Sequence, residues 1–296
     1  MLKVLPDDLR YTTNTRHGEF SSVFSTVPIR RSRKTLTMIP IVRAPQPVPV
    51  EGISRSIEVK IASTESEWEQ AFQLAASSYR ARGYEAPGAS RLRFTSYHAL
   101  PDTLTLVAKH RQKVVATLSV VMDNTVLGLP MEDVYPDEIA ALRRQGRRLA
   151  ETTTLADSGL NVREFIRVFL SLIRLAMQHH RSHGGNTPVI VVNPRHRPFY
   201  TKVLGFVPMG KPKTYAAVQD HPAEAFWVDY DLIKNEMPKT YEEIFGTDLP
   251  EDALFVPTKI PRRLVRKFSQ QSSLCDPKEI QRILDLRKRF SSMRRW

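Results

Sequence analysis

The spacing of apolar residues predicts a strand, a long helix and a second strand in the middle of the chain. Residues 149–155 mix threonine with apolar residues, as strands do, and residues 189–192 form a short apolar run typical of a sheet interior. Between them, residues 162–180 place apolar side chains at the period of an amphipathic helix. This part of the chain is therefore predicted to fold as a βαβ unit.

Upstream, the pattern predicts a strand followed by a helix. Residues 57–61 alternate between apolar and polar side chains, which indicates a strand. Thr64 and Glu67 then have the spacing of a capping box ahead of apolar residues that share one helical face. This helix is expected to end near Gly83.

A β-hairpin and a short helix are predicted next. Residues 104–108 and 114–121 have the composition of strands and are joined by a short connection. Residues 136–142 begin with proline, carry acidic residues near the start and are followed by arginines, which suits a helix and its dipole. We interpret this segment as a candidate lid over a site.

The residues after the second central strand carry a family resemblance. Asn193 and Pro194 favour a turn, and residues 199–206 have the spacing of a short helix that ends at Gly205. Their sequence, FYTKVLGF, resembles the FY and LGF signature of the GNAT acyltransferase superfamily. The predicted order of elements, which is strand, helix, hairpin, strand, helix, strand, helix and one last strand, also resembles that superfamily. The resemblance implies an α/β (α+β) GNAT acyltransferase fold, with a central mixed β-sheet flanked by helices.

Two longer stretches narrow the resemblance. Residues 127–156, LGLPMEDVYPDEIAALRRQGRRLAETTTLA, and residues 192–206, VNPRHRPFYTKVLGF, resemble the N-acyl amino acid synthases, relatives of the acyl-homoserine-lactone autoinducer synthases. The resemblance covers residues 57–232. It implies transfer of a long-chain acyl group from acyl carrier protein to the amine of an amino acid or a related small amine. The donor group would be an acyl-phosphopantetheine, with no tightly bound cofactor.

The chain is predicted to have three parts. Residues 1–56 are basic and rich in proline and are expected to form a flexible N-terminal extension. Residues 57–232 form the GNAT-like domain. Residues 233–296 form a C-terminal extension, which is expected to start as a connection with one short helix.

A basic amphipathic helix is predicted in the C-terminal extension, starting near Asp276. Its apolar face consists of Ile280, Ile283, Leu284 and Phe290, and its basic residues elsewhere are Arg282, Arg287, Lys288 and Arg289. Packing on the domain or docking of a partner is favoured over peripheral contact with an anionic membrane.

The basic residues are concentrated in the two extensions. The net charge is +13, but residues 1–56 carry 9 basic and 4 acidic side chains, and residues 259–296 carry 12 and 3. The part between them has 23 basic and 24 acidic residues and is nearly neutral. A nearly neutral domain argues against nucleic acid as the partner, whereas basic tails suit the acidic surface of acyl carrier protein.

Composition also indicates a compartment. No apolar run approaches the roughly 20 residues that a membrane span needs, and the N-terminal residues lack the apolar stretch of a signal peptide. The single cysteine, Cys275, cannot form an internal disulfide, which suits a reducing environment. We expect a cytoplasmic protein, peripheral to the inner membrane if its C-terminal helix contacts lipid.

The loop before the long helix bears on the identity of the acyl donor. Acetyl-coenzyme A enzymes of this superfamily hold the pyrophosphate with the N–H groups of a glycine-rich loop. Here the loop is ADSGLNVREF, in which Gly159 is the only glycine. Each charge-assisted hydrogen bond that is missing weakens the binding of coenzyme A by about 1.5–3 kcal/mol. A carrier-protein donor has no adenosine pyrophosphate and does not need these bonds, so acyl carrier protein is the predicted donor. Arg163, near the helix start, keeps coenzyme A open as an alternative.

Aminolysis of a thioester requires a proton acceptor, a polarised carbonyl and a proton for the leaving thiolate. Glu151 is the predicted general base, because partial burial raises the pKa of a carboxylate and makes it a better proton acceptor. An ion pair with an arginine is the structural alternative for this residue. The backbone N–H groups of Thr153, Thr154 and Leu155 are predicted to polarise the carbonyl. Tyr200 is predicted to protonate the thiolate.

The resemblance assigns further residues to the acyl donor. Asn193 and Tyr200 correspond to positions that line the pantetheine arm, and Arg195 and His196 belong to the shared PRH sequence beside them. His196 is equally open to a structural role at the start of a helix.

Two other functions stay open, and no metal site is predicted. One alternative is an acetyl-coenzyme A-dependent N-acetyltransferase, and the other is a non-catalytic GNAT-like module with membrane- or nucleic-acid-binding basic tails.

His179, His180 and His183 lack the glutamate of an HExxH motif. The apolar stripe of the long helix is interpreted as core and consists of Phe165, Ile166, Phe169, Leu170, Ile173 and Met177.

Overall fold

The centre of the protein is one mixed β-sheet. The computed structural model describes residues 45–53, 56–86, 88–256 and 259–293, with side chains up to residue 288. The strands are β1 Val48–Pro49, β2 Ile57–Ile61, β3 Leu104–His110, β4 Lys113–Met122, β5 Leu149–Asp157, β6 Thr187–Val192, β7 Val207–Tyr215 and β8 His221–Trp227. Their order in the sheet is β1-β2-β3-β4-β5-β6-β8-β7. Only β5 and β6 pair in parallel among the described strands, because the helix between them returns the chain to the same edge.

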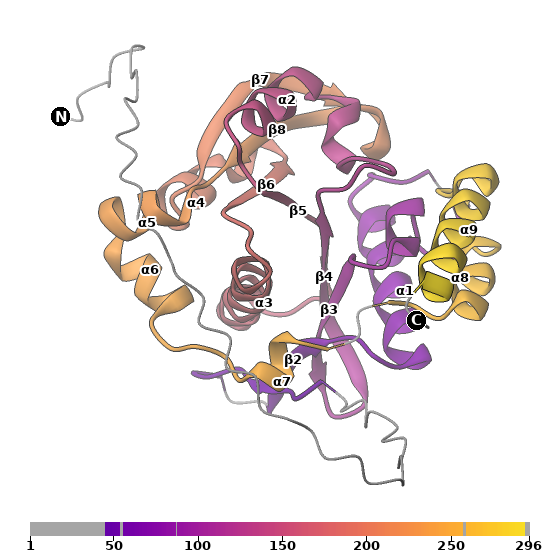
Figure 1. Cartoon of the computed structure of the whole chain (residues 1–296). Helices are drawn as coiled ribbons and strands as arrows, with labels where there is room; N and C mark the ends of the chain where they lie inside the picture. The colour runs from indigo at the N-terminus through magenta and orange to yellow at the C-terminus, as the bar shows by residue number, and fades with distance from the viewer. Residues whose placement is uncertain (1–44, 54–55, 87, 257–258, 294–296) are drawn as a thin grey trace, which may run out of the picture. The chain divides into compact units, whose positions relative to one another are not determined.

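Helices cover both faces of this sheet (Figure 1). One face carries α3 Val162–Ser182, α4 Arg197–Lys202, α5 Tyr230–Glu236, α6 Pro238–Phe245 and α7 Glu251–Leu254. The opposite face carries α1 Glu65–Ala81, α8 Arg262–Ser269 and α9 Pro277–Met293. The short helix α2 Pro136–Arg144 lies near β7 and β8. Each face has its own hydrophobic cluster, with Phe169 and Phe226 on the α3 side and Phe72 and Phe268 on the α1 side.

The predicted elements of the central and upstream parts are confirmed. The βαβ unit is β5, α3 and β6, and β2 and the start of α1 agree with the predicted positions. The hairpin β3–β4 is tighter than predicted, because both strands extend to a two-residue loop in which Arg111 has a φ of 57°. The helices predicted at residues 136–142 and from near Asp276 are also confirmed, as α2 and α9.

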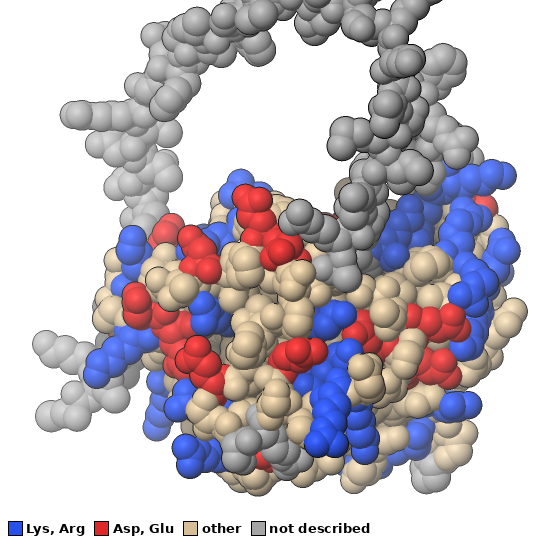
Figure 2. All heavy atoms as spheres, turned by 90° about the horizontal axis from the view of Figure 1, so that it is seen from below, with Lys and Arg blue, Asp and Glu red and all other residues tan. Residues whose placement is uncertain are grey.

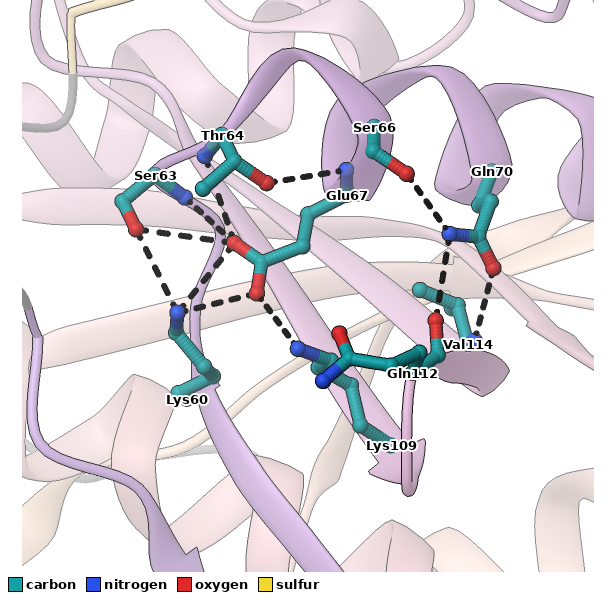
Figure 3. Close-up of polar contacts among 9 residues, drawn as sticks. All are labelled: Lys60, Ser63, Thr64, Ser66, Glu67, Gln70, Lys109, Gln112 and Val114. Carbon is teal, nitrogen blue, oxygen red and sulfur yellow. Dashed lines mark hydrogen bonds and ion pairs between the residues drawn. The ribbon is translucent and has the colours of Figure 1, made fainter.

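The first turn of α1 is held by a buried ionic cluster (Figure 3). Thr64 and Glu67 form the predicted capping box. The Glu67 carboxylate also accepts hydrogen bonds from Lys60 Nζ at 2.9 Å and Lys109 Nζ at 2.8 Å. Burial alone would raise the pKa of Glu67, but bonds from Lys109, the Ser63 N–H and Lys60 outweigh it and hold the pKa at about 2. This cluster joins β2, β3 and α1.

The structure corrects the prediction at both ends of the sheet. Part of the segment predicted as a flexible linker forms β1, which pairs with residues 58–59 of β2, and Val50 behind it is buried. A single last strand was expected, but β7 and β8 form an antiparallel pair. Pro208, Gly210 and Pro212 obscure the strand pattern of β7, where the register shifts at a bulge. Residues 1–44 lie outside the described residues.

More helices follow β8 than the sequence pattern indicated. One short helix was expected in residues 233–258, but α5, α6 and α7 lie there at least in part, and α8 was not predicted. Proline disfavours a helix interior, but here Pro238 is the first residue of α6 and Pro261 is the N-cap of α8. Proline is tolerated at such positions because no helical N–H is lost there.

The C-terminal helix α9 packs on the domain, as predicted. Ile280, Ile283 and Leu284 are buried in the hydrophobic cluster of the α1 face, so its apolar face is already covered by protein. Arg287, expected on the polar side, is instead buried and donates to the carbonyl oxygens of Ala99 and Ile260. The side chains of Arg289 and Phe290 lie outside the described residues.

Most of the other basic side chains described on α8 and α9 face solvent. Figure 2 shows Lys and Arg gathered along the side where these helices lie. The exposed ones are Arg263, Arg266, Lys278, Arg282 and Lys288. No helix of the described residues is long and apolar enough to cross a membrane.

Candidate active site

Strands β5 and β6 separate near the centre of the sheet. They pair only between residues 149–152 of β5 and 187–190 of β6. Beyond this point β5 continues along β4 to Asp157, while β6 remains paired with β8. Where the strands separate, backbone N–H and C=O groups of β5 and β6 no longer bond each other, so they can form hydrogen bonds to a substrate.

A β-bulge lies in β5 beside this separation. The register between β4 and β5 shifts between Thr117 and Ser119, and Thr154 has a φ of 56°. In the pairing of the described strands, Thr154 and Leu155 have no partner residue on β4 or β6, whereas Thr153 lies opposite Ser119. Because bulges interrupt the hydrogen-bond ladder, the backbone at 154 and 155 is better placed than that of Thr153 to bind a substrate carbonyl.

Glu151 is buried on the face of the sheet that α1 covers. Its partners across β4 and β6, Val121 and Val189, both belong to the hydrophobic cluster of that face, and Glu151 itself is 2% exposed. Its Oε2 atom accepts a hydrogen bond from the N–H of Met131 at 2.7 Å. Met131 belongs to the 3-10 helix η2, Pro130–Asp133, which follows β4.

The environment of Glu151 favours its protonated form. Burial raises the pKa of Glu151 to about 8, opposed by the Met131 hydrogen bond and reinforced by the negative charges of Asp133 and Glu132. The desolvation that was predicted is therefore present, and burial is complete instead of partial. Its hydrogen-bond partner in the described part of the chain is a backbone N–H and not an arginine, so the ion-pair alternative is not met.

Two tyrosines share this region with Glu151, and neither was predicted. The Tyr215 hydroxyl donates to the carbonyl oxygen of Pro130 at 3.1 Å. Burial raises the pKa of Tyr215 and of Tyr97, and the charges of Glu151 and Asp133 raise both further. Both phenols are therefore neutral near pH 7 and able to donate hydrogen bonds. They are 64 and 54 residues from Glu151 in sequence, so no local motif marks them.

A cavity opens beside these groups. Its volume is about 400 Å³, and its lining residues are Asp133, Val134, Lys213, Thr214, Tyr215, Ala216, Ala217 and Asp220. It lies between the end of η2 and the end of β7 with the following 3-10 helix η4, Ala216–Val218. Asp133 and Tyr215 thus connect the cavity to the surroundings of Glu151.

Tyr200 lies on the other side of the sheet from Glu151. It is buried in the cluster of the α3 face, where its ring contacts Phe169, Phe206 and Phe226. Burial raises the pKa of Tyr200, and the Tyr79 hydroxyl on α1 raises it further. Tyr79 belongs to the helix on the other face of the sheet. Tyr200 and Glu151 lie on opposite faces of the sheet, so the structure does not bring them into contact.

The residues assigned to the pantetheine arm gather at the end of β6. Asn193 accepts a hydrogen bond from the N–H of Arg195 and caps the 3-10 helix η3, Pro194–His196. Arg195 donates to His196 Nε2 at 3.0 Å and to the Tyr84 hydroxyl at 3.3 Å. Burial lowers the pKa of His196, and the nearby Arg195 and Arg82 lower it further, so its imidazole is neutral.

The residues at the end of β6 form a rim, which also includes Arg82 and Tyr84. The sequence analysis missed these two residues. Arg82 pairs with Asp157 at the end of β5 across 3.3 Å, and Tyr84 reaches Arg195 from the loop after α1. Both residues come from a segment more than 60 positions away from β5 and β6. Only the packing of α1 against the sheet places them at the opening.

Three N–H groups in the loop before α3 and in its first turn already have side-chain acceptors. The Asp157 Oδ1 atom accepts from the N–H of Gly159 at 2.8 Å and of Leu160 at 3.0 Å. The Asn161 Oδ1 atom accepts from the N–H of Glu164 at 3.0 Å and caps the helix. Side chains of the loop thus fill positions that would otherwise bind an anion.

The other reactive side chains have structural partners. His179 bonds to the Leu254 carbonyl oxygen and stacks on His183, and His180 bonds to the Tyr230 hydroxyl. Burial raises the pKa of Cys275 to about 12, which keeps its thiol protonated. On α3, the predicted core stripe is buried at Phe169, Ile173 and Met177 but not at Ile166, which is 36% exposed. The described residues contain no group of three or more potential metal ligands.

Three solved structures are among those to which this chain is similar. The structure of FeeM, an N-acyl amino acid synthase from uncultured soil microbes, is 26% identical with a TM-score of 0.54, covering 62% of this chain and 96% of that chain. The AHL synthase LasI is 14% identical with a TM-score of 0.46, covering 66% and 96%. The coenzyme A-dependent acyl-homoserine lactone synthase BjaI is 16% identical with a TM-score of 0.47, covering 71% and 99%. A search of curated proteins finds no match.

The fold and the separated central strands define an N-acyltransferase with the GNAT fold, as predicted. A family model described as N-acyl amino acid synthase FeeM matches residues 70–229. The chain belongs to this family, and the predicted resemblance is confirmed.

Proposed function

We propose that the protein transfers a long-chain acyl group from the phosphopantetheine arm of acyl carrier protein to the amine of an amino acid or a related small amine. Family membership supports the acyltransferase class. The choice of donor rests on the loop that precedes α3.

The observation that carries this choice is the occupation of that loop by its own side chains. A coenzyme A pyrophosphate would need the N–H groups that Asp157 and Asn161 already bind. It would also approach the Asp157 carboxylate, which repels a second anion. An acyl group on a carrier protein has no adenosine pyrophosphate and does not require these donors. The loop therefore favours the carrier protein.

Glu151 is assigned the role of general base. The amine nitrogen attacks the thioester carbonyl carbon, the C–N bond forms, and the proton released from nitrogen passes to the Glu151 carboxylate. A carboxylate with a pKa of about 8 is well matched to an ammonium proton near neutral pH. Because Glu151 is 2% exposed, the proton reaches it through a water molecule or a neighbouring phenol such as Tyr215.

The developing oxyanion and the leaving group are assigned to the opening between β5 and β6. The N–H groups of Thr154 and Leu155, with Thr153 beside them, would bind the carbonyl oxygen as its negative charge grows. The C–S bond then breaks, and the Tyr200 hydroxyl donates its proton to the thiolate. Burial keeps Tyr200 protonated until that step.

The pantetheine arm is assigned to the rim at the end of β6. Asn193 offers an amide to the arm, and Arg195 with neutral His196 offers donors to its phosphate. Arg82 adds a second positive charge at the same rim. The basic side chains of α8 and α9 and of the N-terminal extension would attract the acidic carrier protein by long-range steering. They could equally attract an anionic membrane surface, which would place a cytoplasmic protein at the inner membrane.

A comparison of donors tests this function. Purified protein is given the same long-chain acyl group on acyl carrier protein or on coenzyme A, with an amino acid as acceptor. We expect kcat/KM for the carrier-protein donor to be at least about tenfold higher, as expected when one or more charge-assisted phosphate contacts are missing. Equal values would indicate a coenzyme A enzyme, and the absence of product with either donor would indicate a non-catalytic module.

A further inference from the structure

Thr154 is held in a backbone conformation that its own side chain disfavours. Its φ of 56° lies in the left-handed region, where a β-branched residue is an outlier. Such strain costs about 1–3 kcal/mol and persists only where the surrounding structure fixes it. The N–H groups of Thr154 and Leu155 are assigned to the oxyanion, so the contacts that fix this bulge also fix those donors.

On β4, the bulge is flanked by two buried hydroxyl groups. Thr117 lies opposite Ala156, on one side of the bulge, and Ser119 lies opposite Thr153, on the other side. Two residues of β5 therefore face a single residue of β4. Thr117 and Ser119 are 2% and 1% exposed, and buried hydroxyl groups of this kind need hydrogen-bond partners.

Both hydroxyl groups bond to elements outside the β4–β5 pair. Thr117 Oγ1 donates to the carbonyl oxygen of Leu106 on β3 at 2.9 Å. Ser119 Oγ lies 3.1 Å from Nε2 of His98, which belongs to the 3-10 helix η1, Ser96–Ala99. Strand β4 is thus fixed on one side of the bulge by the neighbouring strand and on the other side by a histidine.

The hydrogen bonds of His98 define its tautomer. The N–H of Thr95 donates to Nδ1 at 3.0 Å, so the ring proton is on Nε2 and is donated to Ser119 Oγ. Burial, together with the charge of Arg93, lowers the pKa of His98 to about 3. The imidazole is therefore neutral near pH 7 and acts as a fixed donor toward β4.

The 3-10 helix that carries His98 is itself fixed. The His98 ring packs edge-on against Phe72 of α1, with ring centres 4.9 Å apart. At the end of η1, the carbonyl oxygen of Ala99 accepts a hydrogen bond from Arg287 of α9 at 3.0 Å. Helix α9 lies beyond residues 70–229, which the family model matches, so part of this support comes from the C-terminal extension.

We propose that His98 is a positioning residue for acyl transfer, which holds Ser119 and thereby the bulge that directs the N–H groups of Thr154 and Leu155 at the thioester carbonyl. This inference rests on the proposed function. Donors of an oxyanion hole are effective because they are in place before the negative charge develops. His98 acts through β4 and has no contact with the substrate, so its loss should lower kcat and leave substrate binding nearly unchanged.

The test removes the bond from either end. Ser119→Ala deletes the acceptor, and His98→Phe deletes the donor but keeps an aromatic ring. Each should lower kcat about 10- to 100-fold, because a misplacement of about 1 Å costs about 10²-fold, while both KM values stay within about twofold. The variant with both changes should be no slower than the slower single variant, since each change removes the same bond.

Two further variants make the result specific. His98→Gln keeps an amide N–H for Ser119 and should keep most of the wild-type kcat. Thr187→Val removes a buried hydroxyl group from β6 whose partner is Asn186, and it should keep the wild-type kcat. Thermal unfolding of each variant shows whether it is folded. If His98→Phe does not fold, Ser119→Ala, which loses a single oxygen atom, decides the question.

The outcomes separate this inference from the proposed function. The assays use whichever acyl donor wild type prefers, so the inference does not depend on that choice. Wild-type kcat in Ser119→Ala, or an equal loss of kcat in Thr187→Val, overturns the role of His98.

If wild type acylates no amine with either donor, the proposed function fails and NMR tests the bulge alone. The Cα and Cβ chemical shifts of Thr154 report its φ. A change of these shifts in Ser119→Ala and His98→Phe, but not in Thr187→Val, would support the positioning role. Unchanged shifts in the first two variants would overturn it.

Discussion

The backbone N–H of Met131 donates a hydrogen bond to the Glu151 Oε2 atom across 2.7 Å. This contact joins the segment that follows β4 to the central strand of the sheet. A carboxyl oxygen accepts such a bond whether the group is ionised or protonated, so Glu151 keeps its position when it gains a proton. The residue assigned as the base is therefore also an anchor for η2, whose Asp133 lines the neighbouring cavity.

The raised pKa of Glu151 predicts a change of stability with pH. Its pKa is about 8 in the folded protein and about 4.3 in an unfolded chain, so the folded state binds more protons between these values. The free energy of unfolding should therefore fall as pH rises through this window. Glu151→Gln has no such proton, and its unfolding free energy, measured in urea, should fall less between about pH 5 and about pH 8. Identical pH dependence in both proteins would contradict the raised pKa.

The lowered pKa of Glu67 predicts the opposite behaviour in acid. Its contribution to stability is complete above the unfolded pKa of about 4.3 and is lost as pH falls toward the folded pKa of about 2. Glu67→Gln should lower the free energy of unfolding at neutral pH by about 3 kcal/mol, because two buried ammonium groups lose their counter-charge. The matched control is Glu65→Gln, in the same turn but with ion pairs at the surface, which should change stability little. Equal urea midpoints for the two variants would rule out a stabilising role for the cluster.

The loop before α3 predicts how donor preference changes. Asp157→Ala removes a carboxylate and frees the N–H groups of Gly159 and Leu160. The ratio of kcat/KM for acyl-coenzyme A to that for acyl carrier protein should rise about tenfold, because a pyrophosphate then meets free donors and less repulsion. Asp231→Ala, at an exposed position of α5, serves as the charge-matched control. An unchanged ratio in Asp157→Ala would show that this loop does not set the choice of donor.

The basic surface of α8 and α9 predicts a salt-dependent effect on the carrier protein. Deletion of residues 259–296 would remove buried side chains such as Phe268 and Ile283 and would unfold the α1 face, so charge removal is the better test. The proposed fourfold variant changes Arg266, Lys278, Arg282 and Lys288 to Gln. At low salt its KM for acyl carrier protein should rise about threefold or more with an unchanged kcat, and the difference should vanish at high salt.

A second fourfold variant provides the control for this experiment. It changes four exposed basic residues elsewhere on the domain to Gln, namely Lys113, Arg144, Lys234 and Lys239. The net charge falls by the same amount in both variants. Equal increases in KM would mean that overall charge, and not the α8 and α9 surface, attracts the carrier protein.

The sequence predicted the elements with strong local signals. The period of residues 162–180 and the capping box at Thr64 and Glu67 depend on neighbouring residues only, and α3 and the start of α1 agree with them. Strand β7 and helix α8 were missed because Pro208, Gly210 and Pro261 resemble breaks, although bulges and helix starts tolerate them.

Only the part of the candidate site that lies on a single strand could be predicted from the sequence. Glu151 and the N–H groups of Thr153, Thr154 and Leu155 lie together in β5, so the strand alone suggested them, whereas the bulge at Thr154 was not predicted. The cavity residues Asp133 and Lys213 are 80 positions apart and meet because η2 and β7 pack together. Contacts of this kind depend on the tertiary fold, and a single sequence carries no periodic signal for them.

The central claim is that Glu151 accepts the proton of an amino acid during acyl transfer from acyl carrier protein. Its most direct test is the rate of N-acyl amino acid formation, measured by mass spectrometry from about pH 6 to about pH 10 for wild type and Glu151→Gln. We expect wild-type kcat/KM to rise through an apparent pKa near 8, and Glu151→Gln to be about 10²–10⁴-fold slower at neutral pH with partial recovery at high pH, where the amine is already neutral. A Glu151→Gln protein with wild-type rates across this range would contradict the account.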